Sequence, residues 1–310
     1  MSSLGLVAGL ATAALWSATA VCFEAASRRI GSLAVNVLRL VVAQVLFVAL
    51  SLVRTGHAVP RLSGGAWIAL SVSGLVGFVL GDLMLFQAFV LIGARLSMLV
   101  YASVPAMTAL AGYVFLGERI GGRALLGMAV TTAGIALAIS GKRQVDMQTG
   151  SRRRGVLLAL GAAAGQTAGL LLAKAGSSGV DSFAATQVRA LAGLAGFLVV
   201  SVGVGQVREL VAVLRRALVR AAAPDLAPRH ASARTALFSL SLGAVFGPFL
   251  GVSLGLLSAQ LLAAGIASTL MSLVPVLLIP ISILVFRERA SSAEILGTVV
   301  AFAGVVLFSL

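Results

Sequence analysis

Asp82 is a carboxylate that lies well inside a long apolar run, directly after Gly81. Ionisable groups at membrane depth are costly, so each one is a candidate for function by default. A carboxylate at this position could bind the amine of a substrate or carry a proton. It could equally form an ion pair between two helices, for which Arg39 is an available partner. The sequence leaves both interpretations open.

Uncharged polar side chains within the apolar runs are the second group that could contact a substrate. They are Trp16, Ser17, Asn36, Gln44, Gln87, Tyr101, Ser103, Gln166, Thr167, Gln187, Ser268 and Ser272. For any single member, a hydrogen bond between helices is the commoner use of such a residue. As a group they favour a neutral or zwitterionic substrate over a polyanion.

The sequence carries no signature of an enzyme. His57 and His230 fall in polar stretches, and no HExxH, GxSxG or P-loop pattern occurs. Cys22 is the single cysteine, so neither a disulfide within the chain nor a thiolate metal site can form. We therefore expect no catalysis, no cofactor and no bound metal, and any work must come from a gradient or from the substrate itself.

The composition is that of a chain dissolved in lipid. Hydrophobic residues make up 60% of it, charged residues 10%, and the mean hydropathy is +1.10, which a soluble domain of this size could not tolerate on its surface. The formal net charge is +14, but the arginines cluster in short stretches between apolar runs. This pattern indicates membrane orientation and contact with lipid headgroups, not a nucleic-acid partner.

Ten apolar runs, each about as long as a bilayer is thick, define the predicted spans. They cover approximately 4–23, 33–53, 66–90, 96–116, 122–140, 155–174, 182–204, 235–260, 263–286 and 292–310. The runs lack the alternation of barrel strands, so we expect helices and an all-α polytopic membrane protein. The first run has no basic region before it and is interpreted as a span, not a cleaved signal.

The second half of the chain repeats the first. Residues 91–140 align without a gap on residues 261–310, a shift of 170 positions that places Pro105 on Pro275. Five spans in each half mean that the second half enters the membrane from the opposite face. Ten helices in two inverted five-helix repeats are typical of alternating-access carriers.

The hydrophilic stretch 141–154 separates the two halves. We expect a first repeat over 1–140, this linker, and a second repeat over 155–310. The early helices align at a shift of 150 instead of 170, so the second half carries an insert, at 206–234. Its arginine spacing predicts a basic amphipathic helix on the membrane surface, with a disordered basic loop as an equal alternative.

The repeat distinguishes Asp82, which has no charged equivalent in the other half, from Arg39 and Arg189, which are equivalent to each other. Gly81 matches Gly251, but Asp82 matches Val252, so symmetry does not require the acid and a functional role is favoured. Arg39 and Arg189 do match each other, which favours a shared structural duty such as tying two helices together.

Prolines and glycines recur at equivalent positions of the two halves. Pro105 and Pro275 are expected to bend their helices, either as hinges that open a cavity or as static kinks. Glycines seven residues apart occur on the fifth span of each half, at Gly127 and Gly134 and at Gly297 and Gly304. They predict close helix packing, within the bundle or between protomers.

With these features the chain resembles the EamA-type members of the drug/metabolite transporter superfamily. The resemblance rests on the inverted repeats, the proline of each fourth helix, and the sequences Gly117-Glu118-Arg119 and Arg287-Glu288-Arg289 that follow. It implies a basket-like bundle with a central cavity lined by the first, third, fourth, sixth, eighth and ninth helices. The substrate-binding candidates on those helices are Trp16, Asp82, Gln87, Tyr101, Gln166 and Ser272.

The favoured function is export of a small amphiphilic metabolite, with an amino acid first, by alternating access across the plasma (inner) membrane. Efflux of hydrophobic cationic drugs, with Asp82 as the cation partner, is one alternative, and a non-transporting scaffold or lipid-handling protein is another. Protons are candidates for the coupling ion, and the chain is expected to act as a monomer or a homodimer. Sixteen Lys and Arg on odd-numbered loops against five on even ones place both termini outside, whereas the resemblance implies cytoplasmic termini.

Overall fold

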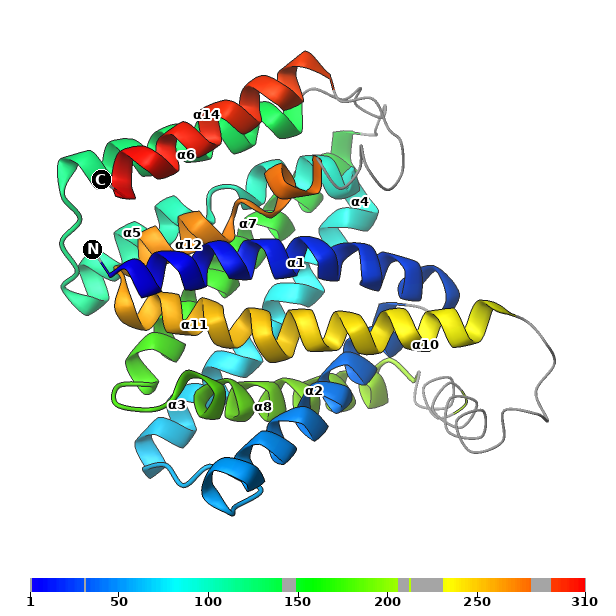
Figure 1. Ribbon diagram of the computed structural model, residues 1–310. Helices are drawn as coiled ribbons and strands as arrows, with labels where there is room; N and C mark the ends of the chain where they lie inside the picture. The colour runs from blue at the N-terminus through cyan, green and yellow to red at the C-terminus, as the bar shows by residue number, and fades with distance from the viewer. Residues whose placement is uncertain are drawn as a thin grey trace.

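The computed structural model describes residues 2–30, 32–140, 149–205, 212, 231–279 and 291–309, and every regular element in these ranges is a helix (Figure 1). The first half contains α1 (Ser3–Ile30), α2 (Ser32–Thr55), α3 (Gly64–Gly74), the π-helical turn η1 (Leu75–Gly81), α4 (Asp82–Tyr101), α5 (Val104–Leu116) and α6 (Gly122–Ser140). The all-α prediction is confirmed.

The second half follows the same order. It contains α7 (Thr149–Gly176), α8 (Ser182–Gly203), α10 (Ala231–Ala244), the π-helical turn η3 (Val245–Gly251), α11 (Val252–Leu261), α12 (Ala264–Met271) and α14 (Ser292–Ser309). Seven helices in the described ranges are long and apolar enough to cross a membrane, and three shorter apolar helices accompany them. Together they match the ten spans expected from the sequence.

Some boundaries differ from the predicted ones. The helix of α7 begins at Thr149, inside the predicted linker 141–154, and residues 141–148 of that linker lie outside the described ranges. Almost all of the predicted insert 206–234 also lies outside them. The expected interruption at 91–95 is absent, since α4 continues to Tyr101 and the chain turns at Ala102 and Ser103 instead.

The packing of α6 on α14 reveals the symmetry of the two halves (Figure 1). A Cβ on Gly134 would lie 2.3 Å from the backbone nitrogen of Ala301, and a Cβ on Gly304 would lie 2.7 Å from the carbonyl oxygen of Gly127. The Thr131 hydroxyl donates to the carbonyl of Ala301, its own repeat equivalent, at 3.3 Å. A contact between equivalent positions is what a twofold axis requires. The two fifth helices therefore cross antiparallel about this axis, and the predicted glycine packing occurs within the bundle.

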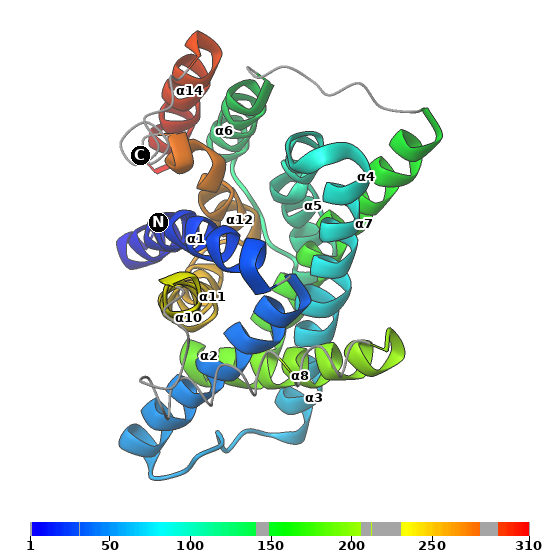
Figure 2. The same ribbon diagram turned by 90° about the vertical axis from the view of Figure 1, so that its right-hand side faces the viewer.

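The first helix of each half packs on the third span of the other half. α1 lies beside α10, η3 and α11, while α7 lies beside α3, η1 and α4 (Figures 1 and 2). Glycines make these contacts close: the Cα of Gly77 would lie 2.8 Å from a Cβ on Gly169. The halves are interlocked and share one bundle, in which both termini lie at the same end (Figure 1).

Candidate functional site

The π-helical turns η1 and η3 occupy equivalent positions, one in each half, and each ends at a glycine. Gly81 ends η1 and lies next to the backbone of Gln166 on α7, while Gly251 ends η3 and lies against the indole of Trp16 on α1. π-helical turns are frequent at functional sites because they re-aim the side chains around them. Trp16 and Gln166, which the shift of 150 positions aligns, therefore lie at equivalent places around the axis.

Hydroxyl groups beside these two residues attach the first helices to the opposite halves. Ser17 Oγ donates to the carbonyl of Val274 at 3.2 Å, directly before Pro275. Thr167 Oγ1 lies 3.2 Å from Thr108 Oγ1 on α5, one turn after Pro105. Each first helix thus holds a fourth span of the other half, close to its proline.

The two prolines lie at helix starts and not within continuous helices. Pro105 is in the first turn of α5, after the turn at Ala102 and Ser103. Pro275 follows a matching turn at Ser272 and Leu273. A proline in a first turn costs little, because the N–H that it lacks would have no intrahelical partner there. Both prolines therefore mark breaks between helical segments, and their role as hinges stays a prediction.

Asp82 forms an ion pair with Arg39 of α2. The Nη2 of Arg39 lies 2.6 Å from Oδ2 of Asp82, and the side chains are 17% and 25% exposed, respectively. The guanidinium also lies over the ring of Phe23 on α1, with its carbon 5.6 Å from the ring centroid. The Nε of Arg39 is buried without a hydrogen-bond partner. The pair is thus partly accessible and keeps one unused donor.

The other predicted site residues are placed as follows. Gln87 is exposed on α4, and Tyr101, the last residue of α4, is partly buried. Ser272 donates its hydroxyl to the carbonyl of Ser268 at 2.8 Å. Trp16 packs against a buried cluster that includes Met271, next to Ser272. The structure thus gathers Trp16 with the segment before Ser272, and Gln166 with the segment before Asp82, while the substrate contacts of all six residues stay predictions.

Arg189 ties three helices together, as its match to Arg39 led us to expect. It is 4% exposed on α8, and its Nε donates to the Ser73 hydroxyl at 2.9 Å. That hydroxyl donates in turn to the carbonyl of Gly169 on α7 at 2.5 Å. The guanidinium carbon lies 5.1 Å from the ring centroid of Phe78. The hydrogen bond from the guanidinium to Ser73 and the contact with the Phe78 ring together offset the free-energy cost of burying this cation.

A second ion pair joins the halves at one end of the bundle, and sequence reasoning missed it. Gly117 adopts a left-handed conformation at the end of α5 and turns the chain so that Glu118 follows. Oε1 of Glu118 lies 2.5 Å from Lys174 Nζ on α7, and Oε2 accepts from the backbone N–H of Ala264 at 2.8 Å. Lys174 also donates to the carbonyl of Leu262 at 2.6 Å. The network spans the break between α11 and α12.

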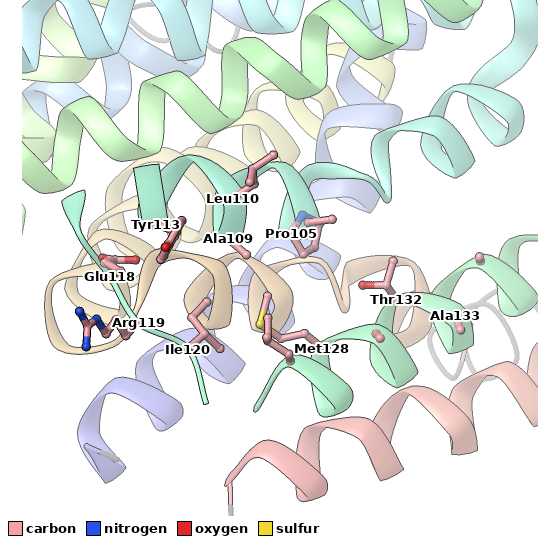
Figure 3. Close-up of a pocket in the computed structure, with 14 residues that line it drawn as sticks. Pro105, Ala109, Leu110, Tyr113, Glu118, Arg119, Ile120, Met128, Thr132 and Ala133 are labelled. Carbon is pink, nitrogen blue, oxygen red and sulfur yellow. The ribbon is translucent and has the colours of Figure 1, made fainter. Parts of the chain in front are cut away.

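A cavity of about 880 Å³ lies between α5 and α6 (Figure 3). It is lined by Pro105, Ala106, Ala109, Leu110, Tyr113, Glu118, Arg119, Ile120, Leu125, Met128, Ala129, Thr132, Ala133 and Ala136. None of the six predicted substrate-binding residues lines this cavity. Among the described residues, no group of three or more His, Cys, Asp or Glu could hold a metal ion.

Comparison with known proteins agrees with this architecture. The model of the EamA-like transporter family matches residues 3–140 and again residues 153–310. No curated protein matches the chain. A solved structure described only as the crystal structure of a protein is similar, with a TM-score of 0.72 and 18% identity, over 99% of this chain and 96% of that chain. At this identity the likeness shows the fold alone. Because the family model matches both halves, the chain belongs to the EamA-like transporter family and is a multi-pass membrane protein of the drug/metabolite transporter superfamily.

Proposed function

We propose that this chain is a secondary transporter that exports a small amphiphilic metabolite, with an amino acid as the favoured substrate, by alternating access across the plasma (inner) membrane. The observation that carries this proposal is the interlocked packing of the inverted halves, in which α1 and α7 each lie on the third span of the other half. Rocking of one repeat against the other about a fixed site is the motion that such symmetry permits.

The Arg39–Asp82 pair supports a zwitterionic substrate over a cationic one. The carboxylate is already neutralised by a guanidinium at 2.6 Å, so a cationic drug would have to displace that guanidinium and leave it unpaired. Separating this largely buried pair without replacing both partners is unfavourable. An amino acid replaces both, because its ammonium would bind Asp82 while its carboxylate would bind Arg39, whose buried Nε has no hydrogen-bond partner in the structure.

Trp16, Gln87, Tyr101, Gln166 and Ser272 are proposed to complete the substrate site. Trp16 and Gln166 occupy equivalent places next to Gly251 and Gly81, so each half contributes one large hydrogen-bonding side chain. Pro105 and Pro275 follow turns in the fourth spans, where small changes in backbone angles would let each span swing. Protons are the proposed coupling ion, carried by Asp82 when the pair with Arg39 separates.

Solute counterflow in proteoliposomes tests the proposal. Vesicles loaded with one unlabelled amino acid should accumulate the labelled form transiently, and the set of amino acids that exchange defines the substrate class. Accumulation of hydrophobic cations instead would favour drug efflux. The absence of counterflow for every solute, with correctly inserted protein, would support a non-transporting scaffold and contradict the proposal.

A further inference from the structure

The cavity lies between α5 and α6 (Figure 3), and none of the six proposed substrate-binding residues lines it. Among the described residues, its walls come from α5, the connection 117–121 and α6. Leu110, Tyr113 and Leu125 line it and are 67%, 63% and 49% exposed. Large apolar side chains this exposed on membrane-spanning helices face lipid, so the cavity is a groove open to the bilayer.

Small side chains on facing positions create the groove. Ala106 and Ala109 belong to α5, while Ala129, Ala133 and Ala136 belong to α6. Because alanine is short, the two helices leave a channel between them where larger residues would interlock. The lining is otherwise almost entirely apolar, which suits a hydrocarbon chain and gives a polar solute few partners.

The length of the groove matches one leaflet of a bilayer. Along α6 the lining runs from Leu125 to Ala136, which at the helical rise of 1.5 Å per residue is about 16 Å. This is about half of the 30 Å thickness of the hydrocarbon core. A single lipid, with its headgroup at one end of the groove, would therefore fit along it.

The end of the groove at the connection 117–121 carries a positive charge. Glu118 is neutralised there by Lys174 and by the N–H of Ala264. Arg119 is exposed, lines the groove and makes no ion pair with any residue in the described part of the chain. The apolar helices end at Leu116 and begin at Gly122, so Arg119 lies at the depth where lipid phosphates lie.

We propose that this groove is a binding site for one anionic phospholipid, with an acyl chain between α5 and α6 and its phosphate on Arg119. The acyl chain fills the space between the alanines, and the guanidinium supplies the charge-assisted hydrogen bonds that phosphate accepts. A zwitterionic lipid shares the acyl contact but gains less at Arg119, because its headgroup carries a compensating cation. The site therefore prefers phosphatidylglycerol to phosphatidylcholine.

Native mass spectrometry of the full-length protein in detergent, titrated with each of these two lipids, tests the proposal. Arg119→Gln should weaken phosphatidylglycerol binding about fivefold, the effect of one basic residue at an anionic membrane surface, and leave phosphatidylcholine binding unchanged. Arg61→Gln, which removes the same charge from an exposed connection, should change neither. Equal losses from the two arginine variants would indicate an effect of net charge and overturn the proposal.

Groove-filling variants test the acyl part separately. Ala129→Phe on α6 or Ala106→Phe on α5 should weaken binding of both lipids, whereas Val199→Phe, on an exposed face of α8, should not. Size-exclusion profiles establish that the variants are folded, and either groove variant alone suffices. Glycerol phosphate should not compete, since it has no acyl chain. Unchanged lipid binding by both groove variants would refute the site, and none of these outcomes depends on whether the protein transports an amino acid.

Discussion

Removing the charge of Glu118 should destabilise the protein by leaving Lys174 as an unpaired cation. In the structure, Nζ of Lys174 lies 2.5 Å from Glu118 and 2.6 Å from the carbonyl of Leu262. Glu118→Gln keeps the shape and can still accept from the N–H of Ala264, but it withdraws the counter-charge. The variant thus isolates the electrostatic part of the network.

The magnitude follows from the burial of the pair. Breaking a fully buried ion pair costs about 3–5 kcal/mol. The side chains of Lys174 and Glu118 remain 20% and 12% exposed, and Lys174 keeps its bond to Leu262. We therefore expect a loss of about 2–3 kcal/mol in the free energy of unfolding. For a chain of this size that corresponds to a decrease in melting temperature of about 3–5 °C.

A double-mutant cycle measured by thermal unfolding in detergent checks this value. Lys174→Met alone should cost a similar amount, whereas Glu118→Gln with Lys174→Met should cost much less than the sum, since no unpaired charge remains. Asp181→Asn is the matched control, because Asp181 pairs with Arg54 at 3.5 Å with both side chains 53% exposed. Such an exposed pair contributes at most about 1 kcal/mol. A loss below about 0.5 kcal/mol for Glu118→Gln, or strictly additive effects in the cycle, would refute the reasoning.

Three further predictions follow from contacts elsewhere in the bundle. Asp82→Asn should abolish coupled flux in proteoliposomes while the yield of purified protein stays normal. The control Asp181→Asn should leave flux intact. Unchanged flux of Asp82→Asn with an unchanged pH profile would remove Asp82 from the mechanism. Gly134→Leu should prevent recovery of folded protein in size-exclusion chromatography, because its Cβ would lie 2.3 Å from the Ala301 nitrogen, whereas Gly122→Ala, with open space around it, should be recovered normally. Ser73→Ala should lower the free energy of unfolding by about 1–3 kcal/mol, since it leaves Arg189 Nε and the Gly169 carbonyl without this hydrogen-bond partner. The control is Thr298→Ala, which removes a hydroxyl that bonds within its own helix. An effect of Ser73→Ala no larger than that of the control would contradict this prediction.

The sequence predicted the architecture because apolar runs and a fixed repeat shift are local, countable signals. The shift of 170 positions relates Gly127 to Gly297 and Gly134 to Gly304, and in the structure those glycines meet across the α6–α14 contact. The matching first helices were predictable in the same way. The repeat did not predict where the helix of the fourth span is interrupted, because Ala102 and Ser103 carry no strong turn signal.

The charged contacts were less predictable, because each depends on which helices become neighbours. For Asp82 the residue types left a substrate contact and a pair with Arg39 open, and only the fold brings Arg39 on α2 to 2.6 Å from Asp82 at the start of α4. The partner of Glu118 is far along the chain, on α7. The motif after the fourth helix singled Glu118 out, but nothing in the order of residues pointed to Lys174.

The symmetry of the backbone and the asymmetry of the charges have different consequences for transport. Equivalent packing of α1 and α7 on the opposite halves implies that the inward-open and outward-open states are built from the same contacts and are close in free energy. Within the described part of the chain, the Glu118–Lys174 network acts on this balance, since it ties the halves at the end of the bundle that holds the connection 117–121. A contact worth about 2–3 kcal/mol at one end shifts such a two-state equilibrium by about 30-fold to about 160-fold. The resting protein should therefore be closed at that end, and opening it requires substrate or proton binding to compensate the lost pair.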